Sequence, residues 1–263
     1  MTTITAASVL KPGNTAVITG ASSGSGRAAA LDFASSKKMN VWMVDIDKDE
    51  LELAHKMVVE ASKGNGDVKV EFRVVDVSDE AAMKKLADEV FADGGKCHFL
   101  FNNAGVFAGG GPMTEMKTLS KTMAINTYGP IHGCQAFVPK MKASGEEGII
   151  VNTGSKQGIT MPPGNLVYNM SKAALKCYTE GLEHDLRTNG DRKLRAALLI
   201  PGWVNTSIFL KTKRDEQLAK GEEFDVSTVF FHSSGWSLDA KASGGLHDGG
   251  TRQGTVLCCL SRQ

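Results

Sequence analysis

Apolar and polar positions along the chain follow two alternating patterns, short unbroken apolar runs and longer segments with helical spacing. The apolar runs are rich in β-branched residues and end at glycine or polar residues, which predicts buried strands. They fall at residues 15–19, 40–45, 68–75, 97–101, 148–153 and 195–200. The segments with helical spacing fall at residues 25–36, 47–62, 79–92, 115–143, 166–189 and 207–220. Strands and helices therefore alternate along most of the chain.

This alternation predicts the fold class. Strands that are apolar throughout are typical of a parallel sheet covered by helices on both faces. Right-handed strand–helix–strand connections then give an α/β fold, a doubly wound parallel sheet of the Rossmann type. We find no internal repeat and predict one domain over residues 1–231, followed by an atypical C-terminal tail at residues 232–263.

A glycine-rich turn follows the first predicted strand. The sequence Gly20-Ala-Ser-Ser-Gly24-Ser-Gly26 lies between that strand and the first long helix. Glycines in this position let the backbone approach a pyrophosphate, which binds at the helix N-terminus. The hydroxyls of Ser22, Ser23 and Ser25 add further phosphate contacts. The spacing differs from the common Gly-x-Gly-x-x-Gly fingerprint, and an ordinary strand-to-helix turn is the alternative interpretation.

A carboxylate ends the second predicted strand. Asp45 lies 25 residues after Gly20, close to the spacing of about 20 residues expected for the acid that binds a nucleotide ribose. A carboxylate accepts hydrogen bonds from both ribose hydroxyls and repels a 2′-phosphate, so we predict NAD over NADP as cofactor. Arg27 and Lys48 are the nearest basic residues that would favour NADP. A helix N-cap is the alternative role for Asp45.

Tyr168 and Lys172 carry the candidate chemistry, together with Ser155 thirteen residues before the tyrosine. Residues four apart on a helix share one face, so the phenol and the ammonium group point into the same space. A tyrosine acts as an acid or base near neutral pH only if its pKa falls from about 10. A neighbouring cation lowers that pKa because it stabilises the phenolate. The alternative is an exposed helix face that carries both residues.

These motifs occur together with four others, and the whole set resembles the short-chain dehydrogenase/reductase family. The motifs that carry the resemblance are Thr19–Gly26, Asp76-Val77, Asn102-Asn-Ala-Gly105, Asn126, Ser155, Tyr168-x3-Lys172 and Pro201-Gly-Trp-Val-Asn-Thr206. They occur in the family's order and at its usual spacing, over about residues 13–210. Any one of them is a weak signal, whereas seven in register are specific.

The resemblance implies a role for each catalytic position. Tyr168 would be the general acid/base, and Lys172 would lower its pKa and hold the nicotinamide ribose. Ser155 would bind the substrate oxygen, and Asn126 would anchor a water chain that carries the proton from Lys172 to solvent. Ser155 alone is also compatible with a turn hydroxyl. Asn126 falls in the middle of a predicted helix, where asparagine is a poor helix former.

The resemblance also implies the cofactor contacts. Asp76 and Val77 would hold the adenine, Asn103 and Gly105 would lie beside the adenosine ribose, and Val204 and Thr206 would contact the nicotinamide carboxamide. A helix cap for Asp76 and plain turn positions for Asn102 and Asn103 remain alternatives. The full predicted cofactor set is Gly20, Ser22, Ser23, Gly24, Ser25, Gly26, Asp45, Asp76, Val77, Asn103, Gly105, Tyr168, Lys172, Pro201, Val204 and Thr206.

Composition excludes several classes of function. The chain has 263 residues and a formal net charge of +1, so charge gives no support for nucleic-acid binding. No apolar stretch approaches the roughly 20 residues that span a membrane. Residues 1–10 have no basic region and too short an apolar core, so we expect no signal peptide there. Five cysteines show no metal-ligand spacing, and we expect thiols in the cytoplasm. No metal site is expected.

The sequence gives the substrate only as a small alcohol or ketone. Trp203 and the apolar residues 208–210 suggest a lid over an apolar or aromatic compound, and the basic run 211–214 is either a solvated helix face or an anion clamp. Val106-Phe107 and Met161-Pro-Pro163 are expected to form other walls of the pocket. The resemblance implies a homodimer or homotetramer that pairs the helices at 115–143 and 166–189.

The tail departs from the family, which normally places a helix and a seventh strand there. Residues 232–254 show no helical period, and an apolar run returns only at 255–260. One hypothesis is a shifted reading frame, since Leu246-His-Asp-Gly-Gly250 can be encoded so that the shifted frame reads Phe-Met-Met-Glu-Gly. The other is a divergent but real segment. Sequencing the transcript distinguishes them, because an uninterrupted frame excludes the first.

Three classes of function remain. The first is an NAD-dependent dehydrogenase or reductase that transfers a hydride between the cofactor and an alcohol or carbonyl. The second is a dinucleotide-binding sensor without catalysis, which would not need Asn126, Ser155, Tyr168 and Lys172 together. The third is an inactive scaffold.

Overall fold

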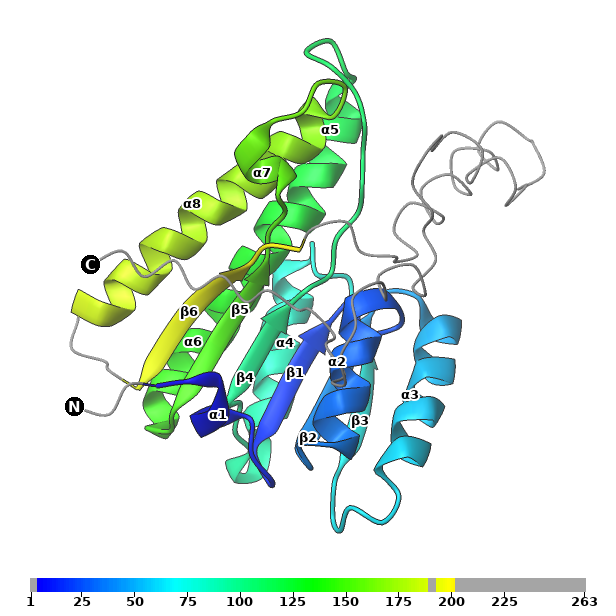
Figure 1. Cartoon of the computed structure of the whole chain (residues 1–263), viewed down its shortest axis with the longest axis vertical. Helices are drawn as coiled ribbons and strands as arrows, with labels where there is room; N and C mark the ends of the chain where they lie inside the picture. The colour runs from blue at the N-terminus through cyan, green and yellow to red at the C-terminus, as the bar shows by residue number, and fades with distance from the viewer. Residues whose placement is uncertain (1–3, 189–192, 202–263) are drawn as a thin grey trace, which may run out of the picture.

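The structure, a computed structural model, describes residues 4–188 and 193–201. Six strands in these ranges form one sheet with the spatial order β3-β2-β1-β4-β5-β6 (Figure 1). Their bounds are β1 Thr15–Thr19, β2 Asn40–Asp45, β3 Val70–Val74, β4 Phe99–Asn102, β5 Gly148–Thr153 and β6 Leu194–Leu199. All five pairings are parallel. This confirms the predicted doubly wound parallel sheet.

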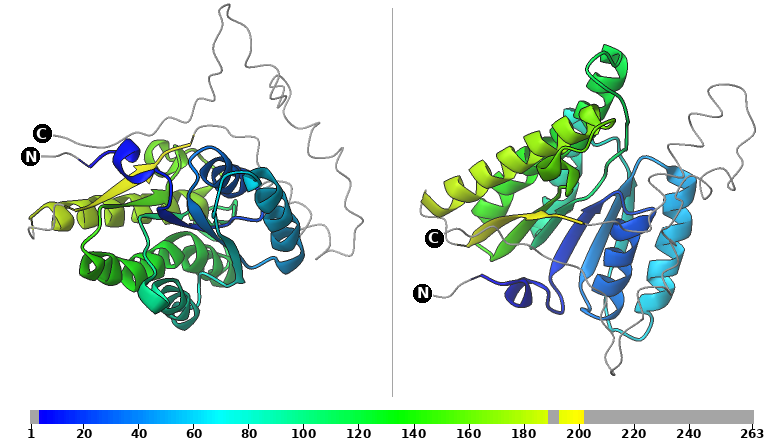
Figure 2. Two further views of the ribbon diagram at one scale, coloured as in Figure 1. Left: turned by 90° about the horizontal axis from the view of Figure 1, so that it is seen from below. Right: turned by 45° about the horizontal axis from the view of Figure 1, so that its top comes forward.

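Helices cover both faces of the sheet, as the turned views show (Figure 2). One layer contains α1 Ala6–Val9, α2 Gly24–Ser35 and α3 Lys48–Ser62. The other contains α4 Glu80–Phe91, α6 Gly129–Ser144 and α8 Leu166–Thr188. Two shorter helices are α5 Met116–Met123 and α7 Gln157–Thr160.

The unbroken apolar runs follow from this two-sided burial. Successive strand residues point to opposite faces, so Ile18 of β1 packs in the core beneath α2 and α3, while its neighbour Val17 packs beneath α4 and α6. Phe101 and Leu100 of β4 divide in the same way. A polar residue facing either side of the sheet would be buried, which explains why apolar and polar residues do not alternate along the strands.

The strand order reverses between β1 and β4, and this position locates the site. β1 pairs with β2 on one side and with β4 on the other, so the connections after the two strands diverge. Ligands of open parallel sheets bind outside the carboxyl ends of the strands at such a switch point. The residues that follow β1, β4 and β5 are therefore brought to one edge of the sheet.

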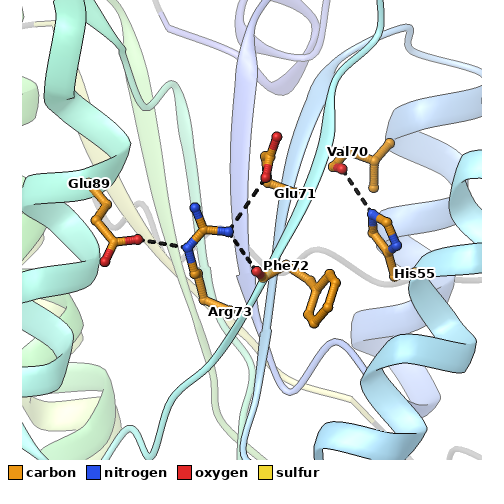
Figure 3. Close-up of polar contacts among 6 residues, drawn as sticks. All are labelled: His55, Val70, Glu71, Phe72, Arg73 and Glu89. Carbon is orange, nitrogen blue, oxygen red and sulfur yellow. Dashed lines mark hydrogen bonds and ion pairs between the residues drawn. The ribbon is translucent and has the colours of Figure 1, made fainter.

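β3 is an edge strand whose exposed side is protected by charge (Figure 3). The Arg73 guanidinium donates to Glu89 of α4 at 2.7 Å and to the Phe72 carbonyl at 2.8 Å, and it lies 4.7 Å from the centre of the Trp42 ring. On the opposite face, the His55 ring is 2.9 Å from the Val70 carbonyl. Charged side chains at an edge discourage pairing with another strand.

The structure differs from the predicted elements at some strand ends and in several helical segments. β3, β4 and β6 differ from their predicted bounds by one or two residues at each end, and a 3-10 helix, Ala92–Gly94, was not predicted. The helix predicted as one segment at 115–143 is interrupted by a π-helical segment, Ala124–Tyr128, between α5 and α6. The four-residue helices α1 and α7 were not predicted. The predicted helix at 207–220 and the boundary between residues 231 and 232 lie outside the described residues.

Candidate active site

The glycine turn after β1 is fixed by backbone conformation and by close packing. Gly20 has φ +66° and Gly24 has φ +52°, values that side chains other than glycine rarely adopt. A Cβ on Gly26 would lie 2.1 Å from the Gly20 carbonyl oxygen, and one on Gly20 would lie 2.8 Å from Ala104 Cα. The first turn of α2 therefore packs directly against the end of β1.

This turn also has the polar groups that an anion needs. Ser23 is the N-cap of α2 and makes no side-chain capping hydrogen bond, so backbone N–H groups of the first helical turn stay available. Within the described residues, the buried hydroxyl of Ser22 has no hydrogen-bond partner. A buried hydroxyl without a partner costs free energy, and a phosphate oxygen would satisfy it. The turn therefore fits the pyrophosphate of a dinucleotide.

Asp45 lies beside the same turn. One carboxylate oxygen accepts a hydrogen bond from the Ser22 backbone N–H at 3.0 Å, and the other accepts from the Asp47 N–H at 3.2 Å. A carboxylate has about four acceptor positions, so two remain for ribose hydroxyls. The alternative role as helix cap is wrong, because Asp47 caps α3 through a hydrogen bond from the Glu50 N–H.

Asp76 and Val77 lie in the connection between β3 and α4. The Asp76 carboxylate accepts from the Ser78 N–H at 2.9 Å and from the Ser78 hydroxyl at 2.7 Å. The helix cap proposed for Asp76 is again wrong, since Asp79 caps α4. Val77 is buried against Gly129, where an added Cβ would lie 2.7 Å from the valine Cγ2.

Asn102 and Asn103 are not plain turn residues. Asn102 is the last residue of β4, and its buried side chain donates to Asn152 Oδ1 of β5 at 2.9 Å. The backbone N–H of Asn103 donates to the Thr19 hydroxyl at 2.9 Å, and its side-chain Nδ2 donates to the Thr19 carbonyl at 3.2 Å. These contacts tie the ends of β1, β4 and β5 together.

Tyr168 and Lys172 lie one turn apart on α8, and both side chains are buried. Tyr168 is 9% exposed and Lys172 is 3% exposed, which excludes the alternative of an exposed helix face. The Lys172 ammonium donates to the Thr153 carbonyl at 2.7 Å and lies 5.8 Å from the centre of the Tyr168 ring. The rings of Phe107 and Tyr168 pack with centroids 5.1 Å apart.

Burial pushes both groups toward their neutral forms. Desolvation raises the pKa of Tyr168, and a hydrogen bond from Ser155 acts in the opposite direction. Desolvation lowers the pKa of Lys172 to about 8. The direction for Tyr168 is opposite to the expectation of a lowered pKa, because the cost of burying a phenolate outweighs the stabilisation that the surrounding groups supply.

Asn126 lies in the π-helical segment, where such a bulge often marks a functional position. Its buried carboxamide accepts from the Val106 N–H at 2.8 Å and donates to the Val106 carbonyl at 2.8 Å. Its Nδ2 also donates to the Ser171 hydroxyl at 3.1 Å. An added Cβ on Gly105 would lie 3.2 Å from Asn126 Oδ1 and 3.6 Å from Lys172 Nζ, so Gly105 leaves space between the two side chains.

Two loops contain the residues that were predicted to form pocket walls, and the structure brings these loops together. Gly110 pairs with the segment before α8, since its N–H donates to the Gly164 carbonyl at 2.8 Å and its carbonyl accepts from the Leu166 N–H at 2.8 Å. This pairing holds the segments around Val106-Phe107 and Met161–Pro163 next to each other.

The structure brings most of the predicted site together at the carboxyl edge of the sheet. Gly20, Asp45, Asn103, Asn126, Ser155, Tyr168 and Lys172 belong to this group, and Pro201 follows β6 at the end of the described range. Val204 and Thr206, the proposed lid, the basic run and the tail lie outside the described residues. Sequence reasoning missed Thr153, which contacts both Lys172 and Asn103.

The described residues are compatible with neither a metal centre nor a membrane-spanning helix. No group of three or more His, Cys, Asp or Glu side chains suited to a metal ion occurs in residues 4–188 and 193–201. Among the helices of these ranges, none has the length and apolar character needed to cross a membrane.

Comparison with known proteins gives one family. The family model for short chain dehydrogenase matches residues 14–217. The oxidoreductase SadH of Mycobacterium tuberculosis is 33% identical over 220 residues, which cover 83% of this chain and 75% of SadH. A short chain dehydrogenase/reductase from Burkholderia phymatum, solved with NAD, is 38% identical with a TM-score of 0.70, and the match covers 75% of this chain and 68% of the Burkholderia chain. A metagenomic short-chain oxidoreductase, solved with NADP, is 30% identical with a TM-score of 0.66, and the match covers 74% of this chain and 85% of the metagenomic chain.

Proposed function

This chain belongs to the short-chain dehydrogenase family, and from that premise we propose that it transfers a hydride between NAD and a small alcohol or carbonyl compound. The observation that carries the proposal is the burial of Tyr168 and Lys172 one turn apart on α8, with Ser155 as a group that lowers the pKa of the phenol. A sensor that only bound the dinucleotide could use the ammonium group to hold a ribose, but it would have no use for a buried tyrosine beside that costly charge.

In this proposal the chain holds the cofactor along the carboxyl edge of the sheet. The turn from Gly20 to Gly26 holds the pyrophosphate, with contacts from Ser22, Ser23 and Ser25, and Asp45 accepts from the ribose hydroxyls. Asp76 and Val77 hold the adenine, and Asn103 and Gly105 line the adenosine ribose. Pro201, Val204 and Thr206 contact the nicotinamide carboxamide. The nicotinamide ring, when bound, accepts or supplies the hydride.

The preference for NAD over NADP rests on Asp45. Its carboxylate is held by the N–H groups of Ser22 and Asp47, so it cannot easily move away from the ribose. A fixed negative charge at this place repels a 2′-phosphate by Coulomb interaction. Similar proteins have been solved with NAD and with NADP. Similarity alone therefore favours neither cofactor, and the preference for NAD depends on Asp45.

The proton passes between the substrate oxygen and solvent through Tyr168 and Lys172. In the direction of reduction, Ser155 donates a hydrogen bond to the substrate oxygen, and the Tyr168 hydroxyl delivers its proton to that oxygen. In oxidation the phenolate takes the same proton back. Lys172, when charged, stabilises the phenolate. Asn126 anchors the water chain through which the proton reaches solvent from Lys172.

The proposal extends to assembly and location. We propose a homodimer or homotetramer that pairs α5, α6 and α8 of two copies, since Met116 of α5, Met170 of α8 and Tyr128 of the π-helical segment between α5 and α6 are large exposed hydrophobic side chains. We also propose a cytoplasmic protein, because the described cysteines, Cys97, Cys134 and Cys177, are free thiols and thiols persist in a reducing compartment.

The test is a titration with NAD and NADP, followed by absorbance of the reduced nicotinamide with a panel of secondary alcohols. In Tyr168→Phe, we expect turnover to fall at least about 100-fold, since a general acid/base contributes roughly 10²–10⁴. Tyr178→Phe is the matched control, a second tyrosine of α8 whose pKa burial also raises, and it should keep turnover. Tight NAD binding without turnover by the unchanged protein would favour the sensor, and a folded protein that binds neither dinucleotide would contradict the proposal.

A further inference from the structure

The Asn103 side chain lies inside the glycine turn. Its Nδ2 donates to the carbonyls of Thr19 and Gly20 at 3.2 and 3.4 Å. A Cβ on Gly20 would lie 3.1 Å from this nitrogen, and one on Gly26 would lie 2.8 Å from it. The turn therefore wraps around the carboxamide, and the two glycines leave the space that it occupies.

The carboxamide oxygen of Asn103 is held from the other side by Thr153. The threonine hydroxyl donates to Asn103 Oδ1 at 3.3 Å, while the backbone carbonyl of the same residue accepts from the Lys172 ammonium at 2.7 Å. Thr153 is the last residue of β5 and pairs with Leu199 of β6. One residue thus contacts both the amide that shapes the glycine turn and the cation beside Tyr168.

We propose that Thr153 is a positioning residue that links the dinucleotide-binding turn to Lys172. Its side chain fixes Asn103 and, through it, the turn, while its backbone fixes the lysine. This inference rests on the function proposed above and adds a residue that none of the recognised motifs contains.

The chemistry of a carboxamide explains why one hydroxyl matters here. The NH₂ group can donate twice and the oxygen can only accept. The two carbonyls of the turn take up both donor positions, so Oδ1 must face away from the turn and needs a donor there. The Thr153 hydroxyl provides that donor. Without it, Oδ1 is left without this partner, and the amide is free to rotate away from the carbonyls that it holds.

The test uses two substitutions at Thr153 and a matched control. Thr153→Val keeps the shape of the side chain and removes the hydroxyl, and Thr153→Ser restores the hydroxyl. Thr179→Val is the control, because the Thr179 hydroxyl is also buried and accepts from the side chain of Asn152 at 3.0 Å, but it does not touch the turn. The readouts are the Kd of NAD by calorimetry, the melting temperature, and KM and kcat where turnover is measurable.

For Thr153→Val we expect the Kd and KM of NAD to rise about fivefold, the effect of losing one net hydrogen bond. The value of kcat at saturating NAD should stay within about twofold of the unchanged protein, since the carbonyl that holds Lys172 is retained. Thr153→Ser should return the Kd of NAD to within about twofold of the value for the unchanged protein. Thr179→Val should lower the melting temperature without changing the Kd, as a purely structural hydroxyl would.

An unchanged Kd in Thr153→Val, with normal binding by the unchanged protein, overturns this inference and leaves the proposed function intact. A raised Kd that Thr153→Ser does not lower overturns it as well, because the hydroxyl is then not the cause. If the unchanged protein binds neither NAD nor NADP, the proposed function itself fails, and the two failures are distinguishable in the first titration.

Discussion

The glycine turn after β1 and the Tyr168–Lys172 turn of α8 lie at the same edge of the sheet and are built by different means. The first is defined by backbone conformation and by the space that missing side chains leave around Gly20 and Gly26. The second is defined by the burial of two ionisable side chains, which shifts both pKa values toward neutral forms.

This difference separates binding from chemistry. A turn that depends on space is sensitive to a single added methyl group and insensitive to pH. A pair of buried ionisable groups responds to pH and tolerates changes of shape better than changes of charge. Substitutions in one region should therefore leave the main property of the other region unchanged.

The largest effect is expected from Gly26→Ala. The new Cβ would lie 2.1 Å from a backbone carbonyl, which no side-chain rotation can relieve. We expect a loss of about 2–3 kcal/mol of stability and a rise of more than about 100-fold in the Kd of NAD by calorimetry. Gly181→Ala in α8 is the control, since nothing lies within 4 Å of its added Cβ, and it should be neutral or stabilising. Wild-type binding by Gly26→Ala would contradict the spatial role of the turn.

A smaller loss is expected from Lys172→Met, chiefly in turnover, with a weaker effect on NAD binding because Lys172 would also hold the nicotinamide ribose. Removing the cation should lower kcat roughly 100-fold, while stability at pH 7 stays the same or rises because a buried ammonium group is removed. Lys176→Met is the control on the same helix, since Lys176 forms an exposed ion pair with Glu180 and should change stability by less than about 0.5 kcal/mol.

The same variant gives a pH test. The pKa of Lys172 falls from 10.5 to about 8 on folding, so the unfolded chain binds the proton more tightly and stability rises with pH between about 8 and 10. Below pH 8, keeping Lys172 charged in the folded protein costs about 3 kcal/mol of stability. Denaturant unfolding across this range should show the stability of the unchanged protein rising relative to that of Lys172→Met, because the other titrating groups are common to both proteins. Lys176→Met should follow the unchanged protein, and the same pH dependence in Lys172→Met and the unchanged protein would contradict the role of Lys172.

The smallest effect is expected from Asp45→Asn, which changes the kind of cofactor and leaves the turn in place. The amide oxygen of asparagine can still accept from the Ser22 N–H, but the charge is lost. We expect the ratio of the two Kd values to shift toward NADP about tenfold, measured by calorimetry with both dinucleotides. Asp49→Asn, an exposed position in the first turn of α3, should leave the ratio unchanged. A ratio that does not move would remove Asp45 as the basis of NAD preference.

The sequence predicts the fold well where burial is two-sided. β1, β2 and β5 have the predicted bounds, because each is an unbroken apolar run between polar or glycine residues. The π-helical segment at Ala124–Tyr128 has no such signal, since it depends on how Asn126 reaches the Val106 backbone. α1 and α7 each have four residues, too few for a helical period to show.

The site is predictable only in part for a related reason. The glycine turn and the Tyr168–Lys172 spacing are local patterns, so the sequence contains them. Asp45 and Asp47 are alike in sequence, and only the structure shows that Asp47 caps the helix while Asp45 holds the turn. Thr153 is an ordinary strand residue, and its link to Asn103 joins positions 50 residues apart, which no local pattern reveals.

The separation of binding from chemistry is tested most directly by calorimetric titration of NAD into Tyr168→Phe and Gly26→Ala beside the unchanged protein. We expect Tyr168→Phe to bind NAD within about twofold of the unchanged protein while losing turnover, and Gly26→Ala to show a Kd raised more than about 100-fold. Loss of NAD binding in Tyr168→Phe, together with normal binding in Gly26→Ala, would contradict the account.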